Sequence, residues 1–243
     1  MIETLIFFIG ASLLLYVVFG GADYGAGVLE LLPVSAELRE KQTKTVNDAM
    51  GPVWEANHIW LILIVVILFI GFPDIFITLM TALHIPMVAL LLGIVVRGCA
   101  FTFRHYDPEY EETSQRVYTL IFGASSLWTS IWLGIIVASL NRGLIRDDAT
   151  TFFDAYIAPW IGLFPILMGI FVLLIFSFLA AVYLIGETRD KALRATFVRR
   201  AYLLNILLII QGALVFAASL REREGLLFQL ITRPATALSL IHI

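Results

Sequence analysis

The stretch GPVWEANHIWLILIVVILFI, residues 51–70, decides the fold class of this chain. Its second half contains only hydrophobic residues, whereas its first half carries Glu55, Asn57 and His58 between two tryptophans. A run of roughly 20 mostly apolar residues is long enough to cross a bilayer as a helix. The stretch therefore predicts a membrane span that takes an acid and an imidazole into the membrane with it.

The composition of the whole chain agrees with a membrane protein. Of the 243 residues, 60% are hydrophobic and only 14% are charged, whereas a soluble domain carries about a quarter charged residues. One globular core cannot bury this many apolar residues. Lipid must therefore surround most of the chain. The formal net charge of −3 is too small to indicate a nucleic-acid partner, and the single cysteine excludes an intramolecular disulfide.

Six segments are long and apolar enough to be membrane spans. In lipid every backbone polar group must be satisfied within its own segment, so these spans are expected to be helices. The predicted fold class is therefore all-α, a polytopic transmembrane helix bundle. The short connection GFPD, residues 71–74, predicts a tight antiparallel hairpin between the second and third spans. The six predicted spans are residues 4–32, 52–72, 75–97, 118–140, 157–185 and 201–220.

The loops predict the domain organisation and the orientation. Residues 1–233 are expected to form one helical bundle domain, followed by an abrupt apolar tail, residues 234–243, that resembles a truncated or non-native end. Eleven of the sixteen Lys and Arg residues fall on the side opposite the N-terminus. Because cytoplasmic loops are enriched in Lys and Arg, the N-terminus is predicted to lie outside.

Several polar residues are expected at one depth, in the cytoplasmic third of the bundle: Asp23, Glu55, Asn57, His58 and Arg97. Ionisable groups inside a span are costly and are functional hypotheses by default. Glu55 and His58 are three residues apart and so share one helix face. They could form a proton relay or an electrostatic partner to a redox centre. Alternatively, Glu55 pairs with a basic loop residue and His58 makes an interhelical hydrogen bond.

Asp23 lies within a glycine-rich helix face that includes Gly21, Gly25 and Gly27. Gly21 and Gly25 form a GxxxG pair, which lets a neighbouring backbone approach closely. An aspartate beside such a face must meet a donor or be protonated. A functional acid and a packing aspartate bonded to backbone or to Asn57 are both consistent with this pattern.

The histidines do not indicate a haem bound between the second and third spans. His84 is expected near the middle of the third span, whereas His58 is expected near the cytoplasmic end of the second. The resulting offset is roughly 10 Å along the bundle axis. Because two axial ligands of one haem must face each other, a bis-histidine site is not expected; His84 is instead expected to mark a kink at Pro86.

Three motifs in chain order resemble a known family, subunit II of cytochrome bd-type ubiquinol oxidases. They are GADYGAGVL (residues 21–29), GPVWEANHIWLI (51–62) and RGCAFTFRH (97–105). The resemblance extends over nearly all of residues 1–230, and the family has about eight spans where six are found here. The residues that match the family's motif positions are Asp23, Trp54, Glu55, Asn57, Trp60, Arg97 and Arg104. The chain departs from the pattern at Gly20, where some members have a second acid, and at Thr102, where members often have a glutamate.

The resemblance implies a bacterial inner-membrane complex that oxidises quinol and reduces O₂. In that family two b-type haems and one d-type haem belong to subunit I, and subunit II supports assembly, haem retention and proton or oxygen access. It also implies a small accessory subunit as a further partner, and no metal or haem bound by this chain alone. A different hypothesis is a proton-coupled transporter that uses Asp23 and Glu55 as coupling acids.

Overall fold

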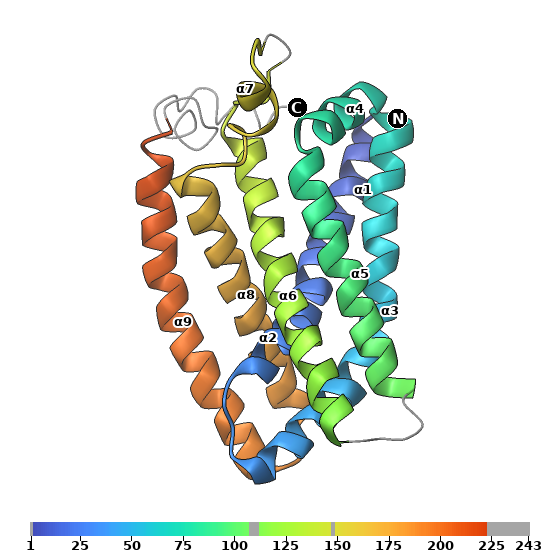
Figure 1. The fold of residues 1–243 in the computed structure, drawn as a ribbon, viewed down its shortest axis with the longest axis vertical. Helices are drawn as coiled ribbons and strands as arrows, with labels where there is room; N and C mark the ends of the chain where they lie inside the picture. The colour runs from blue at the N-terminus through green and yellow to red at the C-terminus, as the bar shows by residue number, and fades with distance from the viewer. Residues whose placement is uncertain (1, 107–111, 147–148, 223–243) are drawn as a thin grey trace.

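The computed structural model describes residues 2–106, 112–146 and 149–222, and within these ranges the side chains of Ala36, Glu55 and Glu112 are not described. The described residues form an elongated bundle of helices (Figure 1). Six helices in this part of the chain are long and apolar enough to cross a membrane. The predicted all-α class with six spans is confirmed, and the predicted tail at 234–243 lies outside the described residues.

The first span is a continuous helix with a change of pitch in its middle. It consists of α1 (Ile2–Leu15), the π-helical turn η1 (Tyr16–Gly20) and α2 (Gly21–Leu31). Single π-turns inside α-helices are rare and are frequent at functional sites. This turn immediately precedes the glycine-rich segment and shifts the register of the helix just before Asp23.

The second span belongs to a much longer helix than the sequence predicted. Helix α3 (Ala36–Gly71) begins sixteen residues before the expected start at 52 and contains Pro52. In Figure 1 its first part crosses the lower end of the bundle, and its second part rises beside α1. The early turns are charged, so hydropathy predicted the apolar part of α3 and did not reveal that the helix begins before it.

The third span was predicted wrongly at both ends. Residues 73–82 form a separate short helix, α4 (Pro73–Ala82), and the span is α5 (His84–Tyr106). Helix α4 lies at the upper end in Figure 1, so residues 71–74 do not make the predicted tight hairpin. His84 is the first residue of α5 rather than a mid-span residue. The prediction was wrong because the apolar sequence of α4 cannot be distinguished from that of a span by composition.

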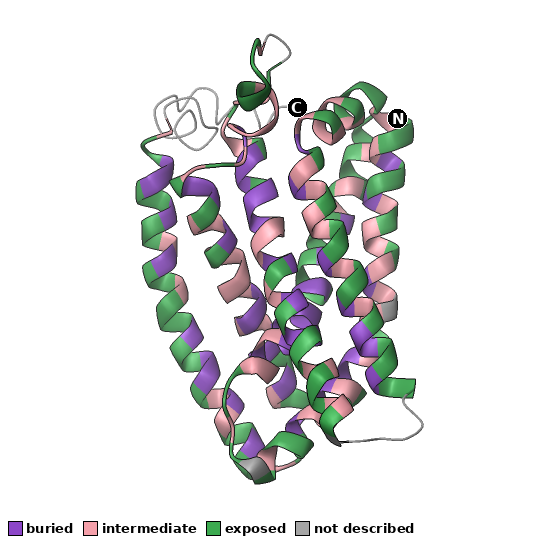
Figure 2. Cartoon of the chain, in the orientation of Figure 1, coloured by how far each residue is buried: buried purple, intermediate pink, exposed green. Residues whose placement is uncertain are grey.

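The remaining helices complete the bundle. Helix α6 (Glu112–Asn141) packs against α2, α5 and α8 (Leu163–Glu187), and α8 also packs against α2 and α9 (Lys191–Ser219). The short helix α7 (Phe152–Tyr156) caps the upper end. Figure 2 shows buried residues facing inward between these helices and exposed residues along their outer faces, which is expected for helices that meet lipid.

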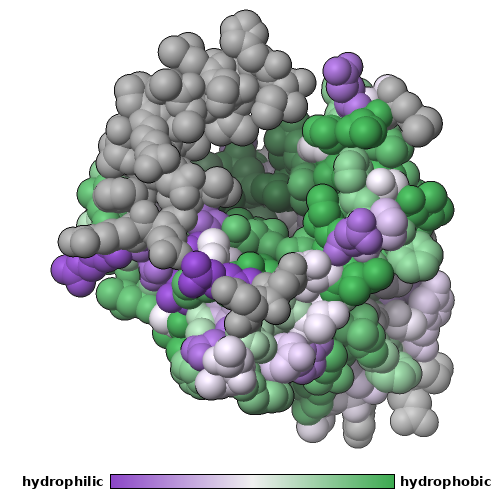
Figure 3. All heavy atoms as spheres, turned by 90° about the horizontal axis from the view of Figure 1, so that it is seen from above, coloured by the Kyte–Doolittle hydropathy of each residue, from purple (hydrophilic) through white to green (hydrophobic). Residues whose placement is uncertain are grey.

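The upper end of the bundle is largely hydrophobic, whereas arginine hydrogen bonds join the helices at the lower end. Seen from the upper end, hydrophobic side chains cover much of the visible bundle and hydrophilic ones gather in a few clusters (Figure 3). At the lower end Arg200 of α9 donates hydrogen bonds to the carbonyl oxygens of Leu29, Leu32 and Pro33, each at 3.2 Å. These carbonyls belong to the C-terminal end of α2 and the following linker. The Leu29 oxygen also accepts from the Leu32 N–H and from the Gln42 amide, so Arg200 adds to the hydrogen bonds that end the helix.

The predicted close approach at the glycine face is observed between α2 and α8. A Cβ atom placed on Gly25 would overlap the backbone carbonyl of Phe176, and one on Gly21 would lie 2.7 Å from the Phe176 ring. On the opposite side of α2, a Cβ on Gly27 would overlap Ser126 of α6. The lack of side chains therefore lets α2 lie tightly between α8 and α6.

Candidate functional site: two buried ion pairs between α2 and α5

The first feature of the site is an ion pair between Asp23 of α2 and Arg97 of α5. The Arg97 guanidinium donates to Asp23 Oδ1 and, at 3.2 Å, to the Asp23 backbone carbonyl. The two side chains are 1% and 2% exposed. Asp23 therefore meets a charged donor, rather than the backbone or Asn57 partner that the packing hypothesis offered.

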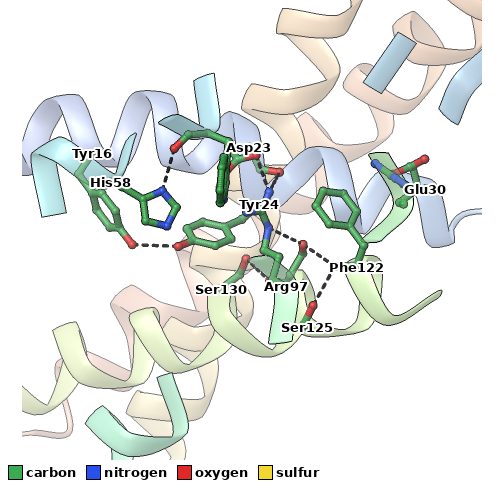
Figure 4. Close-up of polar contacts among 12 residues, drawn as sticks. Tyr16, Asp23, Tyr24, Glu30, His58, Arg97, Phe122, Ser125 and Ser130 are labelled. Atoms are coloured by element: carbon green, nitrogen blue, oxygen red, sulfur yellow. Dashed lines mark hydrogen bonds and ion pairs between the residues drawn. The ribbon is translucent and has the colours of Figure 1, made fainter. Parts of the chain in front are cut away.

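Arg97 is held by further contacts from α2 and α6. Its Nε donates to Ser126 Oγ at 3.0 Å, and its guanidinium carbon lies 4.8 Å from the ring centre of Tyr24 and 4.7 Å from that of Phe122. A desolvated guanidinium over an aromatic face is stabilised by about 2 kcal/mol. The cation is thus fixed in orientation by an acid, a hydroxyl and two rings (Figure 4).

A second ion pair lies two helical turns away. Arg104 Nη1 of α5 donates to Glu30 Oε2 of α2 at 2.8 Å, and these side chains are 0% and 1% exposed. Asp23 and Glu30 are seven residues apart in α2, and Arg97 and Arg104 are seven apart in α5. Because seven residues make nearly two turns, each pair of like residues lies on one helix face, and the two faces oppose each other.

Phe122 of α6 lies between the two cations. Its ring centre is 4.7 Å from the guanidinium carbon of Arg97 and 4.5 Å from that of Arg104. The arrangement alternates charge pair, aromatic ring and charge pair along the bundle axis. We call these five residues the ion-pair ladder: Asp23, Arg97, Phe122, Arg104 and Glu30.

The ladder leaves several buried polar atoms without a partner. Within the described part of the chain, no hydrogen bond is made by Asp23 Oδ2, by Glu30 Oε1 or by Nε and Nη2 of Arg104. Buried polar atoms normally have partners, and each exception needs an explanation. The ladder can therefore make further hydrogen bonds, with buried water or with a ligand.

Two predicted residues of α3 lie beside the upper part of the ladder. Asn57 is 1% exposed, and a Cβ on Gly20, one turn before Asp23, would lie 2.6 Å from Asn57 Oδ1. The Nδ1 atom of His58 lies 2.8 Å from the Trp54 carbonyl oxygen. Figure 4 shows the His58 ring on the side of Asp23 that Tyr16 also occupies.

A tyrosine pair extends the polar group along α2. The hydroxyl of Tyr16, in the π-turn, lies 3.2 Å from that of Tyr24, and both residues are buried. Because Tyr24 also lies under the Arg97 guanidinium, hydroxyl groups continue from the ladder toward the π-turn. Neither tyrosine was singled out from the sequence.

The other predicted residues are placed as follows. The Glu55 side chain lies outside the described residues, although its backbone is part of α3. Trp54 packs against Phe101 of α5, with ring centres 5.7 Å apart, and Trp60 is half-buried. Arg97 does not close its span as predicted, because α5 continues to Tyr106, roughly 14 Å further along the axis.

Sequence reasoning missed Glu30, Phe122 and Ser126. Glu30 falls near the end of the predicted first span, residues 4–32, and was not singled out, and the two α6 residues sit in an ordinary apolar helix. A signal for Glu30 was nevertheless present, because the seven-residue interval between Asp23 and Glu30 repeats the interval between Arg97 and Arg104. No comparable signal marks Phe122 or Ser126, since any small or aromatic residue suits a span interior.

The structure separates His58 from His84, the two histidines considered as haem ligands. No group of three or more His, Cys, Asp or Glu among the described residues could hold a metal ion. His84 begins α5 at the upper end, its ring centre 5.2 Å from that of Tyr156, whereas His58 lies roughly 20 Å below the upper end of α3. These two histidines do not face each other, and their offset exceeds the predicted one.

The comparison with known families identifies the bundle. The sequence model of cytochrome bd terminal oxidase subunit II matches residues 1–243. The chain belongs to this family. As a subunit II of the cytochrome bd type with six candidate spans in its described part, it is a multi-pass membrane protein.

A curated relative shows the same resemblance over a shorter range. The cytochrome bd ubiquinol oxidase subunit 2 of Bacillus subtilis (strain 168) is 30% identical over 155 residues. The match covers 64% of this cytochrome bd subunit II chain and 44% of the relative, so it spans less than half of the relative's length. The ladder residues Asp23, Arg97 and Arg104 are among the positions at which the sequence alone resembled the family.

Proposed function

We propose that this chain is the non-haem subunit II of a membrane quinol:O₂ oxidoreductase of the cytochrome bd type, active only with a haem-bearing subunit I. The family match over residues 1–243 is the observation that carries the proposal. The complex would serve the aerobic respiratory chain in a bacterial inner membrane. The lower end of the bundle in Figure 1, where most Lys and Arg residues lie, would face the cytoplasm.

The cofactors of the complex are assigned to the partner. Two b-type haems and one d-type haem would be held by subunit I, with quinol as the substrate and a small accessory subunit as a further partner. The positions of His58 and His84 support this assignment, because these histidines do not form a pair of axial ligands. When bound, the haems would supply the electron transfer and the O₂ chemistry.

The ladder supports a role for this chain in assembly and haem retention. Two charge pairs that are almost fully buried fix the relative positions of α2, α5 and α6. Removing one partner of a buried pair is strongly destabilising, so such a frame has a single well-defined arrangement. A rigid flank of this kind is suited to hold a partner subunit's cofactor pocket in shape.

A role in proton access rests on the upper part of the ladder. Asp23 Oδ2 and Asn57 Oδ1 are buried acceptors with no hydrogen-bond partner among the described atoms. The His58 ring lies on the side of Asp23 that Tyr16 also occupies (Figure 4). Acceptors without a protein donor are suited to hold a water molecule along a proton path, which Asp23 can do while it stays ionised beside Arg97. Glu55, one turn before His58 in α3, is the fourth candidate for this pathway.

The transporter hypothesis has less support. A coupling acid must gain and lose its proton during each cycle, whereas the Asp23 carboxylate is paired with Arg97 and enclosed by α2, α5 and α6. Protonation of Asp23 would leave the buried Arg97 without its counter-ion, at a cost of several kcal/mol. The oxidase function requires no such protonation.

The test is co-purification with the partner. The chain, expressed with its natural subunit I, is expected to purify as a complex that shows haem d absorption and quinol oxidase activity. Arg97→Met should reduce the haem content per complex, because it weakens the frame. Purification of this chain without a haem-bearing partner, together with substrate-driven proton uptake, would favour the transporter instead.

The proton role has its own test. Glu55→Gln is expected to leave haem content close to wild type but to lower oxidase activity and alter its pH profile. Glu187→Gln, at the exposed end of α8, is the matched control and should change neither. An unchanged pH profile in Glu55→Gln would remove Glu55 from the proposed pathway.

A further inference from the structure

A cavity of about 640 Å³ lies at the lower end of the bundle. Its walls come from the end of α2 and the linker after it, from the first turns of α3 and from the first turns of α6. This volume falls within the range of typical small-molecule sites, roughly 300–1,000 Å³. The cavity lies where the helices leave the apolar part of the bundle, which is the depth of lipid headgroups in a membrane protein.

The walls of the cavity combine two charges of each sign with apolar surface. The acids are Glu30 and Glu40, and the cations are Arg39 and Arg116. Leu31, Leu32, Val34 and Leu120 supply apolar area beside them. A ligand that fits this lining must carry both charges and an apolar portion.

Glu30 gives the cavity a buried polar group that can bind a ligand. Its side chain is 1% exposed and its Oε2 accepts from Arg104, but its Oε1 has no hydrogen-bond partner among the described residues. A buried carboxylate oxygen without a donor costs free energy. The cavity wall therefore presents an acceptor that a ligand donor would satisfy.

We infer that this cavity binds the headgroup of a phospholipid that carries a phosphate and a primary ammonium group, as phosphatidylethanolamine does. The guanidinium of Arg39 suits the phosphate, since guanidinium groups bind phosphate oxygens by paired hydrogen bonds. The ammonium N–H groups suit Glu30 Oε1. The leucines beside the charges give the acyl chains an apolar path to the outer face of the bundle.

Other ligands fit the lining less well. A quinone headgroup offers neither a cation for Glu30 nor an anion for the arginines. Phosphatidylcholine has the phosphate, but its quaternary ammonium has no N–H group to donate. Phosphatidylglycerol has a net negative charge and no cation, and the lining has two acids. The proposal does not depend on the oxidase function of the chain.

Native mass spectrometry of the delipidated, purified complex tests the site, with one phospholipid added at a time. Wild-type complex is expected to retain one phosphatidylethanolamine more tightly than phosphatidylcholine or phosphatidylglycerol, by about tenfold, the loss expected for one charge-assisted hydrogen bond. Arg39→Gln should lower the phosphatidylethanolamine affinity by a similar factor. Arg189→Gln, an exposed arginine outside the cavity lining, is the matched control and should leave it unchanged.

A second variant addresses the carboxylate. Glu30→Gln, which keeps the side-chain volume, should reduce the preference for phosphatidylethanolamine over phosphatidylcholine, whereas Arg39→Gln should weaken the binding of both. Equal affinity of wild type for these two lipids, or an Arg39→Gln variant that binds like wild type, overturns the proposal. So does displacement of the lipid by soluble glycerophosphoethanolamine at equal concentration, or by a short-chain quinone, because either result assigns the cavity to a different ligand.

Discussion

The ion pairs Asp23–Arg97 and Lys41–Asp190 make an informative comparison, because both join segments far apart in the chain. The first is buried, with side chains 1% and 2% exposed. The second lies at the lower end, with an Nζ–Oδ2 distance of 2.8 Å and side chains 45% and 30% exposed. Both pairs are in direct contact, so contact distance does not distinguish them.

The surroundings distinguish the two pairs. Around Lys41 and Asp190, water and salt screen the charges, and each group remains solvated without its partner. Around Asp23 and Arg97, the neighbours are Tyr24, Phe122 and Ser126, and no solvent replaces a lost partner. The buried pair is therefore expected to matter more for stability, because its removal leaves an uncompensated charge in the bundle and not because its attraction is stronger.

The largest expected effect comes from breaking the buried pair. Arg97→Met should lower the free energy of unfolding by about 3–5 kcal/mol, because it leaves Asp23 uncompensated in the bundle. The double variant Asp23→Asn with Arg97→Met should recover much of this loss. Folded protein remaining after graded heating in mild detergent measures both. Equal losses in the single and double variants would contradict this explanation.

The next largest effect is expected from a change at the close contact between α2 and α8. Gly25→Ala should lower the free energy of unfolding by about 2–3 kcal/mol, since the new Cβ overlaps the Phe176 carbonyl and forces α2 from α8. Gly10→Ala is the control, because a Cβ there meets nothing within 4 Å. Thermal unfolding in detergent should separate the two variants, and similar midpoints would show that α2 and α8 can move apart at little cost.

A smaller effect is expected when the ring between the cations is removed. Phe122→Leu should lower the free energy of unfolding by about 1–2 kcal/mol, because two guanidinium groups lose an aromatic face while both ion pairs remain. Phe7→Leu, on the exposed face of α1, serves as control. If both variants unfold alike, the guanidinium–ring contacts do not contribute to the ladder.

The smallest effect is expected at the exposed pair. Lys41→Met should lower the unfolding midpoint at neutral pH only slightly. The side-chain hydrogen bond from Lys41 and backbone hydrogen bonds at the start of α9 lower the pKa of Asp190. The stabilisation that comes from ionised Asp190 is therefore fully present above the ordinary pKa of an aspartate. It is lost as the pH falls through the lowered pKa of Asp190 in the folded protein.

Unfolding measured at decreasing pH tests this direction of the pH dependence. Wild type should lose slightly more stability than Lys41→Met when the pH falls below the ordinary range of aspartate, and the two should converge at the acid end. A large loss in Lys41→Met at neutral pH would contradict the comparison, since it would make the exposed pair as important as the buried one.

The sequence predicted the number of spans but placed their ends only approximately. Hydropathy ended the third span at Arg97, because a charge normally marks the membrane boundary. In the structure α5 continues to Tyr106, since Arg97 and Arg104 both have buried carboxylate partners. A charge can lie inside a span when a distant residue compensates it, and no local window of sequence contains that residue.

The candidate site was predicted in part for the same reason. Asp23 and Arg97 stood out singly, since an ionisable residue in an apolar run is visible without a structure. Their pairing was not visible, because 74 residues separate them and other donors were equally plausible. Glu30 was missed although its spacing from Asp23 matched the arginines, because it lies where a span was expected to end.

The sequence by itself determined that this chain is a helical membrane protein with six apolar spans, and its motifs already resembled those of the family to which it belongs. These are local properties, since each apolar run must satisfy its own backbone in lipid. Only the tertiary structure decided which charges pair, that Phe122 separates two guanidinium groups, and that Glu30 lines a cavity. Those facts depend on how α2, α5 and α6 pack, and packing joins residues that no stretch of sequence holds together.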